Sequence, residues 1–220
     1  VMMVEIGGTV GDIEGEPFLE AVRQMKADLG PQHVFHVHLT LLPYLKAAKE
    51  LKTKPTQLSV RELRRIGLQP DIILTRADYK IPKSLLDKIS RFCDVPREAV
   101  IPAQTVHSIY DVPLNFQKYN IAQIIGEKLG FGPLKPDMRE WVEGSERHEK
   151  VGKPISIALV GKYTYLEDAY LSVLEAIKSA AVHQGRKAEI VWIDSEKLEQ
   201  KDKETWAELK SCKGIVVPGG

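Results

Sequence analysis

Short apolar runs alternate with amphipathic stretches along most of the chain. The runs at 1–6, 33–44, 71–77 and 99–104 are separated by segments in which apolar residues recur every three or four positions, the spacing of one helix face. A short continuous apolar run is typical of a strand buried on both faces. Strands that alternate with amphipathic helices are typical of a parallel sheet covered by helices, so the sequence predicts an α/β fold.

Residue types predict where two of the helices begin and end. The first is expected to begin near Pro17 and to end at Gly30, because proline suits the first helical turn and glycine suits the residue after the last. In a second helix, Ser59 and Glu62 have capping-box spacing and Gly67 is a suitable end. The apolar residues that mark one face of the first, a third and a fourth helix are Phe18, Val22, Met25 and Leu29; Leu85, Ile89 and Phe92; and Ile121, Ile124, Ile125 and Leu129.

A change of composition divides the chain. Residues 131–153 are rich in Gly, Pro and charged residues and have weak periodicity, which indicates an interdomain linker with some helix. A new α/β pattern follows, and its expected elements are strands at 155–161, 187–194 and 214–220 and a helix at 166–185 with Asp168 as candidate N-cap. We therefore predict a first domain over 1–130, a linker over 131–153 and a second domain over 154–220.

The composition is that of a globular protein with balanced charge. The 31 Lys and Arg nearly equal the 30 Asp and Glu, and a formal net charge of +1 gives no electrostatic case for nucleic acid or an anionic membrane surface. Cys93 and Cys212 show neither metal-ligand spacing nor a disulfide framework, which fits a reducing compartment. No apolar run reaches the ~18 residues that span a bilayer, and no signal peptide precedes the first strand. A cytoplasmic location is therefore expected.

Both ends of the sequence fall inside strand patterns. Val1 already lies in an apolar run, and Gly220 closes "GIVVPGG", a strand followed by an unfinished turn. The chain is therefore interpreted as an internal piece of a longer enzyme.

A carboxylate stands near the end of the first apolar run. In a buried strand, Glu5 would cost free energy unless a cation compensates its charge, and ligands of open α/β sheets gather beyond the carboxyl ends of strands. The turn after it combines glycines with further carboxylates: Gly7, Gly8, Gly11 and Gly15 with Asp12, Glu14 and Glu16. Glu5 could bind Mg²⁺, which usually keeps water and phosphate oxygens in its other positions. A salt-bridged strand end before a tight turn is the alternative.

The segment "LKTKPTQ" at 51–57 could bind a nucleotide. Lys52 and Lys54 are expected on one side of an extended backbone, because Pro55 disfavours a helical conformation for Lys54. Two cations with interleaved hydroxyl and amide groups could hold a polyphosphate and the edge of a base, and the residues that supply those groups are Thr53, Thr56 and Gln57. A solvated surface loop is the alternative. Lys88 is expected on the polar face of its helix, where a surface lysine is the ordinary explanation.

Three other patterns carry less information. His36 and His38 alternate within an apolar run without a Cys or carboxylate at metal-ligand spacing, so we interpret them as hydrogen-bonded strand residues. The segment "ALVGKYT" lacks the Gly-x-x-x-x-Gly-Lys phosphate loop, because Ser156 occupies the first glycine position. The turn at Gly219 and Gly220 could present backbone N–H groups to an oxyanion, as many turns after strands could.

Taken together and in order, the motifs resemble the CTP synthase family, glutamine-dependent amidoligases that convert UTP to CTP. The matching segments are "VEIGGTVGDIE", "PFLEAVRQM", "HLTLLPY", "KTKPTQ", "SVRELRRIG", "QPDIILTR", "FCDVP", "SIYDVP", "IALVGKY", "DAYLSV" and "VPGG". The resemblance implies a three-layer, parallel-sheet synthetase domain of the P-loop NTPase and dethiobiotin synthetase type, present here as its second half. It also implies the beginning of a second α/β domain, a class I glutamine amidotransferase.

The resemblance assigns roles to particular residues. Glu5 would match the Mg²⁺-binding carboxylate. Gly219, together with Gly220, would match the oxyanion turn of the glutaminase. Arg76 would match a secondary position near the nucleotide. The segments that would contact nucleotides are Asp12, Ile13 and Glu14 for the inhibitor CTP; Lys52, Thr53, Lys54, Pro55, Thr56 and Gln57 for UTP and CTP; Lys88 for nucleotide phosphates; and Gln104, Thr105 and Val106 for the adenine of ATP.

The resemblance also implies a reaction. ATP phosphorylates O4 of the uracil, and ammonia from glutamine displaces the phosphate at C4. Inhibition by CTP, activation by GTP and a homotetramer are implied as well. The family's phosphate loop, second metal carboxylate and glutaminase Cys, His and Glu find no match here, and Gly15 stands where relatives often have Ser. The 220 residues alone are therefore expected to be inactive.

Two alternatives are kept. Another ATP-dependent amidoligase of the dethiobiotin synthetase type would share the sheet and the metal site, but "KTKPTQ" disfavours it. A non-catalytic nucleotide-binding or assembly module would explain the missing nucleophile and phosphate loop.

Overall fold

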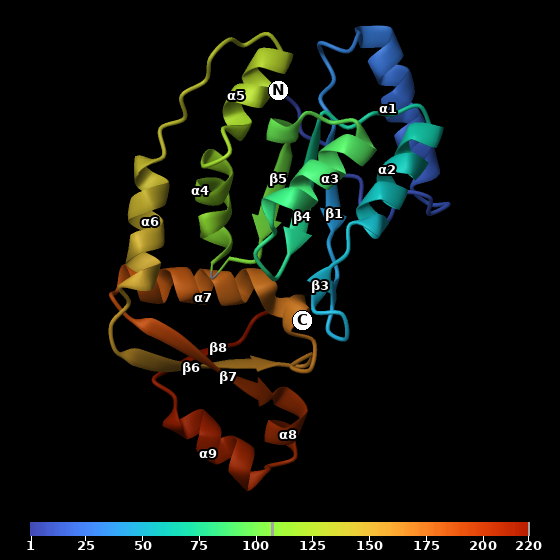
Figure 1. Ribbon diagram of the computed structural model, residues 1–220. Helices are drawn as coiled ribbons and strands as arrows, with labels where there is room; N and C mark the ends of the chain where they lie inside the picture. Colours follow the sequence, from blue (N-terminus) through green and yellow to red (C-terminus); the bar gives the residue numbers. More distant parts are fainter. Residues whose placement is uncertain (107, 220) are drawn as a thin grey trace. The chain divides into compact units, whose positions relative to one another are not determined.

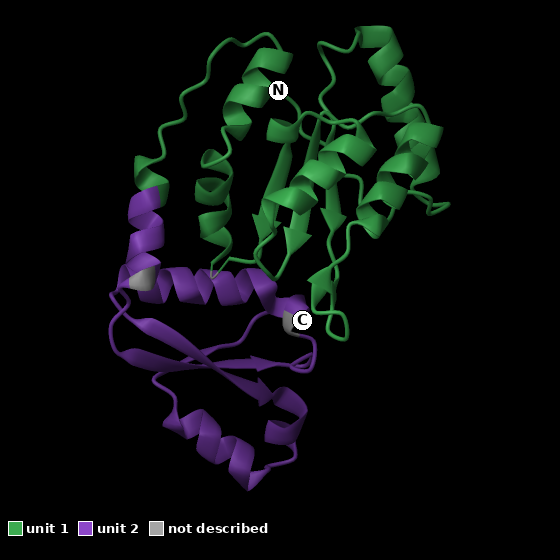
Figure 2. Ribbon diagram, in the orientation of Figure 1, with its two compact units in different colours: residues 1–141 green, residues 142–220 purple. Residues whose placement is uncertain are grey.

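The computed structural model describes residues 1–106 and 108–219. The chain divides into two compact units, Val1–Trp141 and Val142–Gly220, coloured separately in Figure 2. Both units contain parallel sheets with helices, so the predicted α/β class is confirmed. Among the described residues, no helix combines the length and the apolar character needed to cross a membrane.

The first unit is built on a parallel sheet of three strands in the order β1-β4-β5. Its arrows point in one direction in Figure 1. The strands are β1 (Val37–Leu41), β4 (Ile72–Ala77) and β5 (Val100–Gln104), and a separate hairpin pairs β2 (Tyr44–Leu45) with β3 (Glu50–Leu51). Two of the predicted strands, at 71–77 and 99–104, are confirmed almost to the residue.

Helices connect and cover these strands. In the first unit they are α1 (Glu16–Leu29), α2 (Lys54–Arg65), α3 (Lys83–Cys93), α4 (Val112–Gln117) and α5 (Ile121–Lys128), with 3₁₀ turns η1 (Arg97–Ala99) and η2 (Ile109–Asp111). Helix α6 (Arg139–Glu149) spans the division between the units and falls in the segment predicted to be a linker with some helix. The predicted bounds of the first helix are confirmed, with Pro17 in its first turn and Gly30 as its C-cap. Most of its predicted apolar face does not pack: Phe18, Met25 and Leu29 are exposed, and Leu19 is the buried residue.

The core of the first unit lies between the sheet and its helices. Ile72, Ile73 and Ile101 of the strands pack with Leu86 and Ile89 of α3 and are fully or almost fully buried. A smaller cluster joins α1 to the end of α2 through Leu19, Leu63 and Leu68, and Ile6 and Val10 pack against it. The loop before α1 is therefore anchored by its own apolar residues.

The second unit has helices on both faces of its sheet. Its elements are the strands β6 (Pro154–Gly161), β7 (Lys187–Asp194) and β8 (Gly214–Val216) in the parallel order β7-β6-β8, the 3₁₀ turn η3 (Glu167–Tyr170), and the helices α7 (Leu171–His183), α8 (Ser195–Glu199) and α9 (Lys203–Ser211). On one face, Leu159 packs with Tyr170 and Leu174, while on the other Ala158 packs with Leu209 of α9. The three predicted strands are confirmed.

The predicted strand over residues 1–6 is wrong. Residues 1–7 form no helix or strand, and Val1 to Val4 are exposed. An apolar run becomes a buried strand only where neighbouring strands pair with it and helices cover it, and residues 1–6 pair with no strand in the part of the chain that the structure describes. The premise that Glu5 is buried fails for the same reason.

Two predicted caps are also wrong. Helix α2 begins at Lys54, so Ser59 and Glu62 lie inside it and form no capping box. Asp168 lies in η3, and Tyr170 is the N-cap of α7. In α2 the real start is set by Pro55 in the first turn, a position that suits proline because its missing N–H would be unpaired there anyway.

Candidate functional site

The three strands of the first unit end at one edge of the sheet. Leu41 of β1 is in register with Arg76 of β4, and Ala77 of β4 with Gln104 of β5. We call this the carboxyl edge: the ends of the three strands and the segments that follow them at 42–57, 76–79 and 104–106. In Figure 1 the β2–β3 hairpin lies beyond the arrowhead of β1. Ligands of open α/β sheets bind at this kind of edge.

A carboxylate and two lysines lie together at the carboxyl edge. The backbone N–H of Lys52 donates to the carbonyl of Pro43 (2.9 Å), which holds the segment against the end of β1. The Lys52 ammonium forms a hydrogen-bonded ion pair with Glu50. That hydrogen bond, with the charge of Lys52, holds the pKa of Glu50 below its ordinary value, and the nearby charge of Lys88 lowers it further. The structure thus brings Lys52 and Lys88 to the same acidic group.

The rest of the 52–57 segment divides into structural and exposed residues. Thr53 and Thr56 are buried: the Thr56 hydroxyl donates to Thr40 Oγ1 (3.0 Å), and Thr53 Oγ1 accepts from the amide of Gln57 (3.1 Å). Lys54 and Pro55 are exposed in the first turn of α2. The prediction of an extended backbone at Lys54 is wrong, because Lys54 is already helical. Its ammonium stands instead at a helix N-terminus, where unpaired N–H groups and the helix dipole favour an anion.

The segments after β4 and β5 are bonded to each other. The N–H of Thr105 donates to the carbonyl of Ala77 (3.0 Å), and the Thr105 hydroxyl donates to Asp78 Oδ1 (2.6 Å). Gln104 and Val106 are half-buried on either side, and the exposed Arg76 stands at the end of β4. The predicted residues Arg76 and Gln104 to Val106 therefore share the carboxyl edge with Lys52.

Sequence reasoning missed two tyrosines at this edge. Tyr44 begins the hairpin after β1 and Tyr79 follows β4, and their rings lie 4.2 Å apart between centroids at an angle of 31°. Tyr79 is 50% exposed. Glu50 and Asp78 were missed as well. The signal that could have found Asp78 and Tyr79 is their position directly after a buried strand, since that position defines the edge of the sheet.

The loop before α1 places the predicted acidic residues in the open. Glu5, Ile13 and Glu14 are exposed, whereas Asp12 folds back so that its Oδ2 accepts from the N–H of Thr9 (2.7 Å). Gly8 has φ +83°, a value that residues with a side chain rarely adopt, so glycine is required for this turn. Within residues 1–106 and 108–219, no group of three or more His, Cys, Asp or Glu could hold a metal ion.

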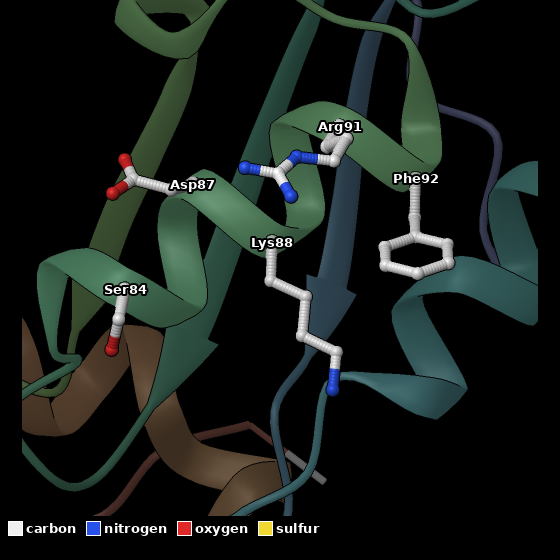
Figure 3. A pocket seen from close by; sticks show the side chains of 5 residues that line it. All are labelled: Ser84, Asp87, Lys88, Arg91 and Phe92. Atoms are coloured by element: carbon white, nitrogen blue, oxygen red, sulfur yellow. The ribbon is translucent and has the colours of Figure 1, made fainter.

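An open hollow of about 400 Å³ lies on the outer side of α3. It is lined by Ser84, Asp87, Lys88, Arg91 and Phe92, all from this helix. Figure 3 shows that Lys88 and Phe92 extend on the side of α3 that faces α2, whereas Asp87 points the other way. Phe92 is 59% exposed, so its predicted place on the packed face is wrong: Leu86, Ile89 and Cys93 form that face instead.

The histidines and cysteines have structural surroundings. His38 is buried in β1 and its Nε2 lies 2.9 Å from Ser59 Oγ, which confirms a hydrogen-bonded strand residue. For His36 the interpretation is wrong, because it precedes the strand and its buried Nδ1 has no partner among the described residues. Burial raises the pKa of Cys93 to about 11, which leaves a neutral thiol rather than a nucleophile. Cys212 is half-buried and, like Cys93, free.

The predicted oxyanion turn is only partly described. Gly219 follows β8 in an exposed segment, and Gly220 lies outside the described residues.

Comparison with known proteins agrees with the motifs. The family model described as "CTP synthase N-terminus" matches residues 1–131. The chain is 52% identical to the CTP synthase of Symbiobacterium thermophilum and 50% identical to those of Dehalococcoides mccartyi (strain BAV1) and Pelotomaculum thermopropionicum. Each alignment covers all of this chain, but only 41%, 40% and 41% of the respective relative. With a match over more than half of its residues, the chain belongs to the CTP synthase N-terminus family.

Proposed function

We propose that the chain is part of a CTP synthase, which aminates UTP at C4 of the uracil at the expense of ATP with ammonia from glutamine. One observation supports this most strongly: Lys52 is paired with Glu50 at the edge where a parallel sheet binds ligands, and the charge of Lys88, from a separate element, acts on the same carboxylate. A reaction between two triphosphates needs such cations, because the negative charges brought together must be offset.

We assign the nucleotide-binding roles to the carboxyl edge. Lys52, Lys54 and Lys88 bind the phosphates of UTP, or of CTP as inhibitor, and the first turn of α2 adds backbone N–H groups. Thr53 and Thr56 are buried and fix the shape of the segment, and Pro55 sets the start of the helix. The remaining proposed contacts are Gln57 to the same nucleotide, Asp12, Ile13 and Glu14 to CTP, and Gln104, Thr105, Val106 and Arg76 to ATP.

The Glu50–Lys52 ion pair explains how the site accepts an anion. Without a ligand, the ammonium of Lys52 is held by a nearby carboxylate. A bound triphosphate offers more negative charge and competes for that lysine, so binding exchanges one ion pair for another instead of desolvating a free cation.

Mg²⁺ is proposed as the metal, with Glu5 as its protein ligand. Glu5 is an exposed carboxylate, and Mg²⁺ commonly takes one or two carboxylates, with water and substrate phosphates in its other positions. When bound, the ion would offset the charge of the ATP phosphates. The assignment rests on the resemblance, because the expected buried strand around Glu5 is not formed.

Further proposals concern the whole enzyme. We propose a boundary region at 131–153 and, from 154 on, the beginning of a glutamine amidotransferase domain in which Gly219, with Gly220, forms the oxyanion turn. Activation by GTP, inhibition by CTP, a homotetramer and a cytoplasmic location are proposed on the resemblance alone.

Product identification tests the proposed function. A polypeptide that carries this chain and spans the full length of its relatives is mixed with UTP, ATP, Mg²⁺ and glutamine, and the nucleotides are separated. We expect CTP, ADP, phosphate and glutamate. A protein that forms no CTP, with either glutamine or ammonia as nitrogen source, would overturn the proposal.

A matched variant tests the metal ligand in the same assay. Glu5→Ala should abolish CTP formation while glutamine hydrolysis persists, because the glutaminase site is separate. Glu16→Ala, which removes another exposed carboxylate from the same region, serves as the control and should keep CTP formation. Normal CTP formation by Glu5→Ala would refute the role of this residue.

A further inference from the structure

The aromatic pair at the carboxyl edge has a free side. Tyr79 rests on Tyr44 with 4.2 Å between ring centroids, yet half of its surface is exposed. A tyrosine stacked on one side and open on the other is a rigid platform for a second flat ring, because its position is already fixed before a ligand arrives. Stacking of a nucleobase on such a ring is favourable for any base, since every base has a π face.

We propose that Tyr79 is the platform on which the adenine of ATP stacks, an inference that rests on the proposed function. Tyr79 directly follows Asp78, which is bonded to Thr105 (2.6 Å), and Thr105 belongs to the segment proposed to contact ATP. The hydrogen bond from Thr105 to the carbonyl of Ala77 (3.0 Å) fixes the two segments side by side. The residue that carries the ring therefore directly follows the segment bonded to the proposed adenine contacts, while the ring itself packs on Tyr44.

The polar group next to Tyr79 favours adenine over uracil. Thr105 occupies Oδ1 of Asp78, and Oδ2 makes no hydrogen bond with the residues that the structure describes. A carboxylate oxygen is only an acceptor. It can accept from the exocyclic amine of adenine, whereas uracil has no exocyclic amine and offers only a ring N3–H between two carbonyl oxygens that a carboxylate repels.

The experiment compares nucleotide dependence in variants of the full-length polypeptide. Tyr79→Ala should raise KM for ATP about tenfold, because one stacking contact is lost, while KM for UTP stays within about twofold. Tyr79→Phe keeps the ring and should restore KM for ATP. Tyr79→Leu keeps bulk against Tyr44 but has no aromatic face and should behave like Tyr79→Ala, which covers the case in which the alanine variant folds poorly.

Tyr119→Ala is the matched control, since Tyr119 is also a partly exposed tyrosine of the first unit, at 37%. It should leave both KM values unchanged. An unchanged KM for ATP in folded Tyr79→Leu, or a rise in KM for UTP alone, would overturn the proposal. Direct titration of each variant with ATP gives a Kd without any product being formed. If the protein binds ATP but forms no CTP, the proposed function is wrong, but the Kd values of the variants still show whether Tyr79 binds ATP.

Discussion

Lys52 has a defined partner before any nucleotide is present. Its ammonium is paired with Glu50, and Lys88 adds its charge to the same carboxylate. A lysine whose position is already restricted loses less side-chain entropy when it binds a phosphate than a free surface lysine does. At the residue scale the site is therefore organised around the Lys52–Glu50 ion pair, with the charge of Lys88 acting on the same carboxylate.

Removal of the Lys52 ammonium should affect one substrate. Lys52→Ala in the full-length polypeptide should raise KM for UTP by about tenfold or more, the loss expected for one charge-assisted hydrogen bond. Glutamine hydrolysis should persist. Lys118→Ala, which removes an exposed lysine of the first unit outside the carboxyl edge, is the control and should change neither the KM for UTP nor glutamine hydrolysis. Steady-state kinetics with UTP varied checks the prediction, which an unchanged UTP dependence would contradict.

His38 makes stability depend on pH. Burial, followed by the charge of His36, lowers its pKa from 6.5 to about 4. The folded state therefore favours the neutral ring, so the contribution of His38 is fully present above pH 6.5 and is lost as the pH falls from 6.5 towards 4. Between pH 7.5 and pH 5 the loss should be about 2 kcal/mol of unfolding free energy.

Urea unfolding of the chain and of His38→Gln at the two pH values measures this loss. The glutamine can still bond Ser59 but cannot titrate, so its stability should change less with pH than that of the parent chain. The half-buried His36, whose pKa is also lowered, is present in both proteins, so the comparison measures the contribution of His38 together with its coupling to His36. His33→Gln, at an exposed position, should leave the pH dependence intact. Equal pH dependence of His38→Gln and the parent would contradict the prediction.

At the scale of elements, β1 and β4 differ in what covers them. Every residue of β4 except Leu74 and Arg76 is buried, because β4 lies between two strands and under helices. In β1 burial alternates, with His38 and Thr40 buried and Val37, Leu39 and Leu41 exposed. How much an apolar side chain contributes to the free energy of unfolding therefore depends on whether neighbouring strands and helices cover its strand. An apolar run in the sequence does not reveal that covering.

Two aliphatic residues of opposite exposure in the two strands make this testable. Ile73→Ala should cost about 2–5 kcal/mol of unfolding free energy, because Ile73 is fully buried and the surrounding core cannot collapse around the cavity. Leu39→Ala should cost less than about 1 kcal/mol, because 61% of Leu39 is exposed. Urea denaturation followed by circular dichroism compares them, and similar costs for both variants would contradict the assignment of the core.

At the scale of the whole molecule, each unit has its own core. The sheet and helices of Val1–Trp141 pack around one set of buried residues, and those of Val142–Gly220 around another. The proposed nucleotide contacts all lie in the first unit and the proposed oxyanion turn in the second. The two half-reactions of the proposed enzyme therefore draw on different units.

The 220-residue chain by itself should form no CTP and hydrolyse no glutamine. The segment "ALVGKYT" lacks the Gly-x-x-x-x-Gly-Lys loop, and the resemblance matches neither Cys93 nor Cys212 to the glutaminase nucleophile. Cys93 is in addition buried with a raised pKa. Activity assays on the chain, beside a polypeptide that spans the full length of its relatives, check this. CTP formation by the 220 residues alone would show that the missing motifs are dispensable.

The sequence by itself determined the elements whose signals are local. The helix from Glu16 to Leu29 follows from a proline at its start and a glycine at its end, and the strand at 72–77 follows from a buried apolar run. The motif series also predicted the family, and the match over residues 1–131 confirms it. These features depend on neighbours within a few positions, which the sequence contains in full.

Only the tertiary structure decided which residues meet and which stay exposed. The run at 1–6 finds no strand to pair with among the described residues, and Phe92 turns outward although its spacing suited the core. Glu50 pairs with Lys52 and feels the charge of Lys88, which is 38 positions away, and Tyr79 stacks on Tyr44, which is 35 positions away. Periodicity determines the side of a helix or strand on which a residue lies. The residue that it contacts on that side comes from a distant segment, and the sheet register and the helix packing determine which residue that is.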